Sequence, residues 1–197
     1  MTHEEAKQLC IEAHKGQWRR PRPINFEHTK LPMNYKHQFV GNSDDGLVNI
    51  DGNLITYEHD TIMIAEPYST HPIAVAEMMD TDEEKIVAYL HDVIEDCNYT
   101  FHRFVDQYMI GLKPSKPHLF VVEDALPLTY DIARAIDLLT KQKGMSYNDF
   151  IKRLVDSGSK LALKVKIADM FHNMSGNPTP KQKQKYLNGI KILLKAL

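Results

Sequence analysis

The stretch that most constrains how this chain can fold is residues 88–96, where one imidazole and three carboxylates interrupt an apolar pattern. If the stretch is helical, His91 lies one turn from Glu95 and Asp92 one turn from Asp96, so each pair shares a side of the helix. Carboxylates crowded in this way repel one another unless a cation lies among them, and an adjacent His-Asp pair offers it a nitrogen and an oxygen ligand. A solvated acidic helix end is the alternative, but apolar residues on both sides of the pair favour a metal site.

A second apolar stretch, residues 161–174, contains an Asp in the middle of an expected core helix. Burying Asp169 is costly unless the carboxylate is paired or bound to a metal. Its helical neighbours are Lys166, His172 and Asn173, so a salt bridge to Lys166 is an alternative to a metal. Such a pair would suffice on an exposed helix but not on a core one.

His71 precedes Pro72 at the expected start of another helix, which Ser69 or Thr70 can cap. A single His at such a place is usually structural, and it becomes a candidate ligand only together with the two stretches above. The candidate metal ligands are His71, His91, Asp92 and Asp169. Two imidazoles and two carboxylates suit manganese, iron or zinc, and ligand type alone does not choose among them.

A helix is expected from Thr2, with Glu5 completing a capping box, to about Gly16. A basic cluster follows it, formed by Lys15, Arg19 and Arg20 and stopped by prolines. These cations either complement the helix dipole or form a phosphate clamp, and the pattern leaves both interpretations open.

Residues 24–66 lack helical periodicity and are interpreted as an inserted flap. Within them, residues 47–57 predict a β-hairpin around an Asp-Gly turn, and residues 60–65 could add a third strand. Further helices are expected over residues 72–79, 100–108, 130–142, 146–154 and 181–197, and an irregular loop over 111–128. The predicted fold class is therefore all-α, a bundle of about eight helices with a small β-hairpin insertion.

Length and composition limit the function classes. A chain of 197 residues is sufficient for one domain, here expected over 1–197, with 43% hydrophobic and 25% charged residues. A net charge of −2 argues against binding of a nucleic-acid polymer but allows a small anionic substrate. Two cysteines make no disulfide framework, and no signal peptide or membrane-spanning stretch is expected, so a soluble cytoplasmic protein is predicted.

The order His…His-Asp…Asp resembles that of the HD-domain metal-dependent phosphohydrolases. Several stretches resemble, more narrowly, the hydrolase domain of RelA/SpoT proteins and its small stand-alone relatives. They are Ala13-His14-Lys15-Gly16-Gln17, Pro67-Tyr68-Ser69-Thr70-His71-Pro72, Leu90-His91-Asp92-Val93-Ile94-Glu95-Asp96 and Lys164-Val165-Lys166-Ile167-Ala168-Asp169. The resemblance covers most of the chain outside 24–66 and 111–128.

The resemblance implies a helical hydrolase that uses manganese, held by the four candidate ligands. It implies that Glu95 and Asp96 orient and activate the attacking water, and that Arg19 and Arg20 lie near the nucleotide base. Asn173 matches an Asn that reaches the ribose, while Lys15 and Lys166, with the two arginines, would hold anionic groups. The family removes the 3′-pyrophosphate of guanosine tetra- and pentaphosphate, and an animal relative removes the 2′-phosphate of NADPH.

Three hypotheses follow. The first is a manganese-dependent pyrophosphohydrolase acting on alarmone-like nucleotides. The second is a phosphatase of another nucleotide, such as a deoxynucleotide, a nucleoside monophosphate or NADPH, because the metal core is shared. The third is a nucleotide-sensing module without turnover. Within 197 residues, no synthetase domain like that of the long bifunctional relatives is expected.

Overall fold

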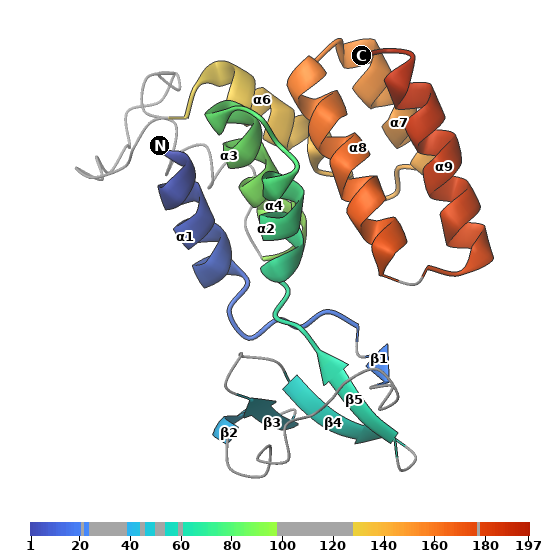
Figure 1. The fold of residues 1–197 in the computed structure, drawn as a ribbon. Coiled ribbons are helices and arrows are strands. Elements are labelled where there is room, and N and C mark those ends of the chain that lie inside the picture. Colours follow the sequence, from blue (N-terminus) through green and yellow to red (C-terminus); the bar gives the residue numbers. More distant parts are fainter. Residues whose placement is uncertain are drawn as a thin grey trace. The chain divides into compact units, whose positions relative to one another are not determined.

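The computed structural model of the chain describes residues 1–20, 22–23, 39–43, 46–49, 54–58, 61–97, 128–176 and 178–197. These residues belong to two compact units, one made of Met1–Ala13 with His71–Leu197 and the other of His14–Thr70. The first unit is helical and the second contains a sheet (Figure 1). The expectation of a single domain with an insertion at 24–66 stays a prediction.

The helical unit has the following described helices: α1 (His3–Ala13), α2 (Thr70–Glu77), α3 (Asp82–Leu90), α4 (Val93–Asp96), α6 (Tyr130–Leu139), α7 (Tyr147–Ser157), α8 (Lys160–Ser175) and α9 (Pro180–Leu194). The predicted fold class, a helical bundle with a small β insertion, is thus confirmed. The helix expected over 100–108 and the loop over 111–127 lie outside the described residues.

Local hydrogen bonds set the starts of several helices as the sequence predicts. The Thr2 hydroxyl accepts a hydrogen bond from the Glu5 backbone N–H at 3.3 Å, and the Glu5 carboxylate accepts one from the Thr2 N–H at 2.7 Å. Thr81 and Glu84 form the same reciprocal pair at the start of α3. Each pair satisfies two N–H groups that would otherwise lack a partner at a helix start.

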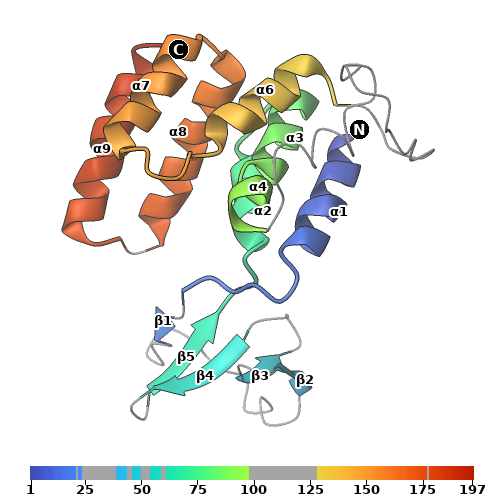
Figure 2. The ribbon, with the colours of Figure 1, turned by 180° about the vertical axis from the view of Figure 1, so that it is seen from behind.

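The core of the helical unit lies where α3, α6 and α8 pack on one another, with α1 against α3 and α9 against α8. Figures 1 and 2 show α8 and α9 side by side along their lengths. Among the described residues, the largest fully buried apolar side chains are Val75, Val87, Leu90, Val93, Ile136, Leu154, Leu163, Met170 and Leu193. Fully burying such a side chain stabilises the fold by about 1.5–3 kcal/mol. This packing fixes α8, which contains Asp169, and the end of α3, which His91 and Asp92 follow directly.

The prediction that residues 88–96 form one continuous helix is wrong. The helix α3 ends at Leu90, His91 and Asp92 form a turn, and α4 begins at Val93. The His91 ring offers a reason, because its Nδ1 lies 2.7 Å from the Ala88 carbonyl oxygen, a group that a continuing helix would use. The turn directs both side chains of the pair inward from one short segment.

The second unit contains an antiparallel sheet with the strand order β1-β5-β4-β3-β2. The strands are β1 (Arg22–Pro23), β2 (Phe39–Ser43), β3 (Gly46–Asn49), β4 (Leu54–Glu58) and β5 (Thr61–Ala65). The pairing of Leu47 with Ile55 confirms the predicted hairpin, and β5 is the expected third strand, paired along β4. The Asp-Gly turn itself lies outside the described residues, and β1 and β2 were not predicted.

The two ends of this second unit are tied together by backbone hydrogen bonds. The Arg19 N–H donates to the Glu66 carbonyl oxygen at 2.8 Å, and the Tyr68 N–H donates to the Gln17 carbonyl oxygen at 2.9 Å. The chain therefore enters and leaves the unit along two paired segments.

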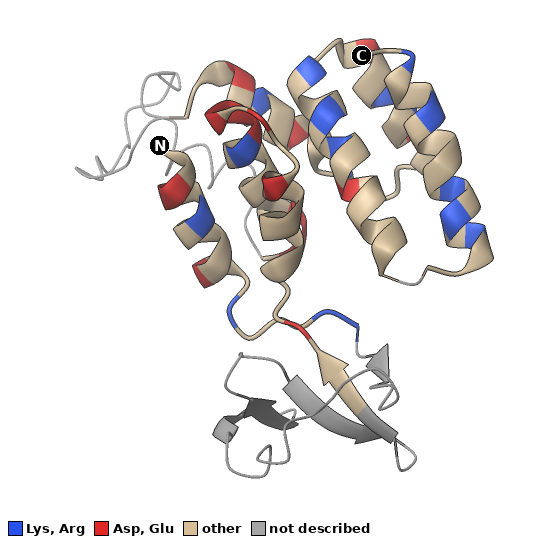
Figure 3. Ribbon diagram, viewed as in Figure 1, with Lys and Arg blue, Asp and Glu red and all other residues tan. Residues whose placement is uncertain are grey.

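Charge is unevenly distributed over the helical unit (Figure 3). Acidic side chains gather on α3, whereas α9 contains several lysines and neither Asp nor Glu. Among the helices that the structure describes, none combines the length and the hydropathy that crossing a lipid bilayer requires.

Candidate metal centre

Three segments of the helical unit bring two imidazoles and a carboxylate to one buried point. His71 lies in the first turn of α2, His91 in the turn after α3, and Asp169 within α8. All three are nearly inaccessible, with exposed fractions of 2%, 2% and 4%. One ligand atom from each lies within 4.8 Å of the others, so the three could hold a metal ion.

Asp92 lies at the same point. Its Oδ2 is 3.1 Å from the Nε2 of His91 and 3.5 Å from the Nε2 of His71. The Oδ1 of Asp169 is 3.0 Å from the Nε2 of His71 and 3.9 Å from that of His91. The structure thus brings together the four residues that the sequence predicts as ligands, with the two Nε2 atoms facing the two carboxylates.

The orientation of the His91 ring fits a metal. Its Nδ1 donates to the Ala88 carbonyl oxygen, because a carbonyl can only accept. The opposite nitrogen, Nε2, is buried and has no hydrogen-bond partner with acceptable geometry. A buried polar atom without a well-formed hydrogen bond is uncommon, and a metal ion between this nitrogen and the two carboxylates would satisfy it. The donor set is therefore suited to a divalent cation.

The charges of the cluster explain how it is held without a metal. Burial alone lowers the pKa of His91, but the carboxylates of Asp92 and Asp169 outweigh it and raise this pKa to about 10. Burial raises the pKa of Asp92, but the His91 imidazolium outweighs it and lowers this pKa to about 2. Without a metal, a proton on His91 thus provides the positive charge between the carboxylates. A divalent ion would displace that proton.

Both oxygens of the Asp169 carboxylate have partners on α8 itself. Lys166 Nζ lies 2.7 Å from Oδ2, and the Asn173 side-chain amide donates to Oδ1 at 2.6 Å. Burial raises the pKa of Asp169, but the Lys166 ammonium and the imidazoles hold it well below its ordinary value. The salt bridge considered as an alternative to the metal site is present, and it lies beside the cluster rather than in place of it.

Glu95 and Asp96 are exposed on the short helix α4. The Glu95 carboxylate accepts a hydrogen bond from the Lys141 backbone N–H at 3.1 Å. Because the chain turns at His91 and Asp92, the two carboxylates do not continue one α3 helix face as the sequence analysis expected. Their role in activating water stays a prediction.

Lys15, Arg19 and Arg20 belong to the second unit, so their predicted contact with substrate stays a prediction as well. Lys15 and Arg20 are exposed and Arg19 is half-buried. Lys166 and Asn173 both contact the Asp169 carboxylate, and their own predicted contacts with substrate likewise stay predictions.

Two further side chains make contacts that the sequence did not predict. His172 lies against His71, with 2.7 Å between their Nδ1 atoms. Lys185, on α9, lies with its Nζ 4.3 Å from the centre of the Tyr147 ring. Burial lowers the pKa of Lys185, and the positive charges of Lys166 and Lys141 lower it further, so three cations lie close enough to interact.

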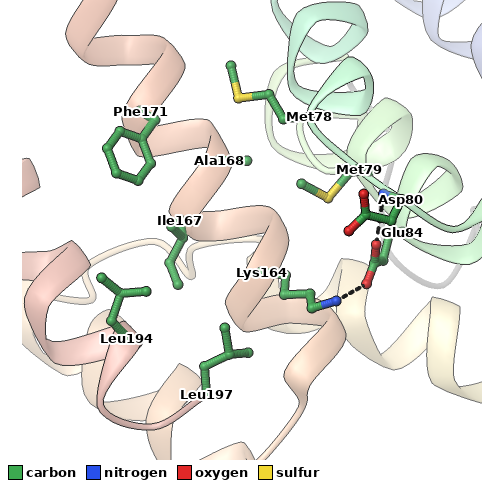
Figure 4. A pocket seen from close by; sticks show the side chains of 10 residues that line it. All are labelled: Met78, Met79, Asp80, Glu84, Lys164, Ile167, Ala168, Phe171, Leu194 and Leu197. Carbon is green, nitrogen blue, oxygen red and sulfur yellow. Dashed lines mark hydrogen bonds and ion pairs between the residues drawn. The ribbon is translucent and has the colours of Figure 1, made fainter.

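A cavity of about 260 Å³ lies elsewhere on the helical unit and has a different character. It is lined mainly by apolar side chains, and the ion pair of Lys164 with Glu84, 2.6 Å long, lies at one side (Figure 4). None of the candidate metal ligands lines it. Its apolar lining does not suit a highly charged substrate.

No known protein-family model matches the chain. Among solved structures, the chain is similar to a metazoan ortholog of SpoT that hydrolyzes ppGpp and plays a role in starvation responses. The match covers 98% of this chain and 84% of that chain, with 16% sequence identity and a TM-score of 0.48. The activity proposed below rests on the residues of the chain itself.

Proposed function

We propose that this chain is a divalent-metal-dependent phosphohydrolase acting on nucleotides, with His71, His91, Asp92 and Asp169 as metal ligands and manganese as the metal. The observation on which the proposal chiefly depends is the buried cluster of nitrogen and oxygen donors, in which the Nε2 of His91 lies 3.1 Å from Asp92 Oδ2 without the geometry of a hydrogen bond. The ion would lower the pKa of a water molecule and neutralise charge on phosphate oxygens.

In this proposal, a few further side chains around the cluster hold the substrate, fix a ligand in place or accept a proton. Glu95 or Asp96 accepts a proton from the attacking water, in keeping with the resemblance of their motif. Asn173 donates to Asp169 and Lys166 pairs with it, so together they fix this ligand in place. Lys166, with Lys141 and Lys185, supplies positive charge for the anionic groups of a nucleotide.

The leading substrate is a guanosine 3′,5′-bis(diphosphate)-like alarmone, which would lose its 3′-pyrophosphate. This choice rests on the resemblance of the motifs to the RelA/SpoT-type hydrolases. In the same proposal, Lys15, Arg19 and Arg20 contact the nucleotide and the protein works in the cytoplasm. Another nucleotide phosphatase activity is the alternative, because such phosphatases share the metal core.

A product assay tests the proposal. The full chain is stripped with a chelator, reloaded with manganese and offered guanosine 3′,5′-bis(diphosphate), NADPH, deoxynucleotides and nucleoside monophosphates. We expect release of pyrophosphate from the first, abolished by Asp92→Ala and retained by Asp156→Ala, an exposed change outside the cluster. Turnover of another substrate alone would replace the alarmone and keep the class. Tight nucleotide binding without any turnover would instead favour a sensing module.

A further inference from the structure

The contact between His71 and His172 is an imidazole pair formed across the helical unit. The two Nδ1 atoms are 2.7 Å apart, and the ring centres are 4.8 Å apart with an interplanar angle of 37°. His71 belongs to α2 and His172 to α8, so the contact joins the two elements that supply two of the four proposed ligands. His71 is buried and His172 is half-buried.

At 2.7 Å the two nitrogens must share one proton, since two N–H groups or two lone pairs would repel each other. The Nε2 of His71 faces Asp169 Oδ1 at 3.0 Å and Asp92 Oδ2 at 3.5 Å. A His that binds a metal through Nε2 has its proton on Nδ1. His71 is then the donor of the pair and His172 the acceptor.

We propose that His172 is a positioning residue for the metal, accepting a hydrogen bond from the Nδ1–H of His71 and so fixing the ring with its Nε2 toward the ion. This inference rests on the proposed function, in that it requires a metal in the cluster. His172 itself is not a ligand in this proposal.

The other imidazole of the cluster is oriented in the same way by a different group. The Nδ1 of His91 donates to the Ala88 carbonyl oxygen at 2.7 Å. Each proposed His ligand therefore has an acceptor behind it, a backbone group for His91 and a side chain for His71. Acceptors of this kind fix the tautomer and the ring orientation, and their loss typically weakens metal binding about 10–100-fold. Only the acceptor behind His71 can be removed by substitution.

Two substitutions separate the hydrogen bond from the packing of the ring. His172→Phe keeps a flat ring against His71 but removes the acceptor. His172→Asn has less volume, yet its amide oxygen can occupy about the place of Nδ1 and accept the same bond. His172→Leu is a second variant without an acceptor, in case Phe is not tolerated. His3→Phe is the matched control, because His3 contacts Glu4 and Asp82 rather than the cluster.

The experiment measures manganese binding to the chelator-stripped full chain by titration calorimetry, and the absorption spectrum of the cobalt-loaded chain as a signature of coordination. Circular dichroism in chelator checks that each variant is folded. We expect His172→Phe and His172→Leu to bind manganese about 10–100-fold more weakly and to alter the cobalt spectrum. His172→Asn should stay within a few-fold of wild type, and His3→Phe should match it.

Equal binding by wild type and His172→Phe would overturn the inference while leaving the proposed metal site intact. Equal weakening by the Phe and Asn variants would also overturn it, because ring packing rather than the acceptor would then matter. If wild type binds no metal, the proposed function fails, and the positioning role fails with it.

Discussion

Replacing Asp169 with Ala should destabilise the metal-free protein by about 3–5 kcal/mol. The reason is Lys166, whose Nζ lies 2.7 Å from the Asp169 carboxylate and whose side chain is only 18% exposed. Burial lowers the pKa of Lys166, but Asp169 outweighs it and raises this pKa above its ordinary value. Without the carboxylate, the ammonium stays desolvated and unpaired, and this accounts for the size of the loss. The amide of Asn173 also loses its acceptor.

The free energy of unfolding is best measured by urea denaturation at neutral pH with a chelator present. The chelator keeps metal out, so the measurement reports the network of charges and not the ligand. Asp156→Ala is the matched control, because Asp156 forms an ion pair with Lys152 at 2.6 Å in which both side chains are exposed. An exposed pair of this kind contributes only about 0.3–0.5 kcal/mol.

A double variant tests the cause. Adding Lys166→Met to Asp169→Ala removes the unpaired charge, so it should recover much of the lost stability even though the pair stays broken. The reasoning is refuted if Asp169→Ala costs no more than Asp156→Ala. It is also refuted if the second substitution destabilises the protein further by a similar amount.

Three more predictions concern the metal, a helix contact and the thiols. The affinity for manganese should rise about tenfold per pH unit from about pH 6 to pH 8. The pKa of His91 is raised to about 10, so His91 is protonated over this range. Manganese must displace that proton, and the displacement becomes easier as the pH rises. Calorimetry in two buffers of different ionisation enthalpy counts that proton, and an affinity independent of pH would argue against the mechanism. Gly189→Ala should destabilise the fold by about 1–3 kcal/mol, because the added Cβ overlaps the Tyr147 hydroxyl oxygen. In thermal denaturation Tyr147→Phe should suppress part of that loss, and an unchanged Gly189→Ala protein would disprove the overlap. Burial raises the pKa of Cys10 to about 12, so iodoacetamide at mildly alkaline pH should label the half-buried Cys97 first by mass spectrometry. Equal labelling of both thiols in the folded protein would contradict this.

The starts of helices could be predicted because they depend on groups three residues apart. The pairs Thr2–Glu5 and Thr81–Glu84 are complete in the sequence, and the structure contains both. The hairpin of β3 and β4 was predictable for the same local reason. The strand β1 was not, because its partner β5 lies far along the chain and two residues leave no pattern.

The turn at His91 shows where periodicity misleads. The apolar pattern continues through it, so a single helix was expected, but one side-chain hydrogen bond to Ala88 accompanies the end of the helix. The sequence could not predict this bond, because its formation depends on how the ring is buried.

The proposed ligands were predictable as residue types, since a buried Asp and an adjacent His-Asp pair are unusual in apolar stretches. Their convergence depends on packing of α2, α3 and α8. His172 was missed because its partner, His71, lies 101 positions away, and a half-polar helix face is ordinary by itself. Lys185 was missed because an exposed lysine on a basic helix is equally ordinary.

The paired ends of the sheet unit bear on how the chain folds. The helices α1 and α3 pack together although the whole of His14–Thr70 lies between them in the sequence. Joining the ends of a loop costs more conformational entropy as the loop lengthens. Once the strands that follow Gln17 and precede Tyr68 have paired, the helices meet across a connection as short as a hairpin. A folding rate estimated from the sequence separation of α1 and α3 would therefore be too slow. The helical unit should instead fold at a rate set by the contacts within it.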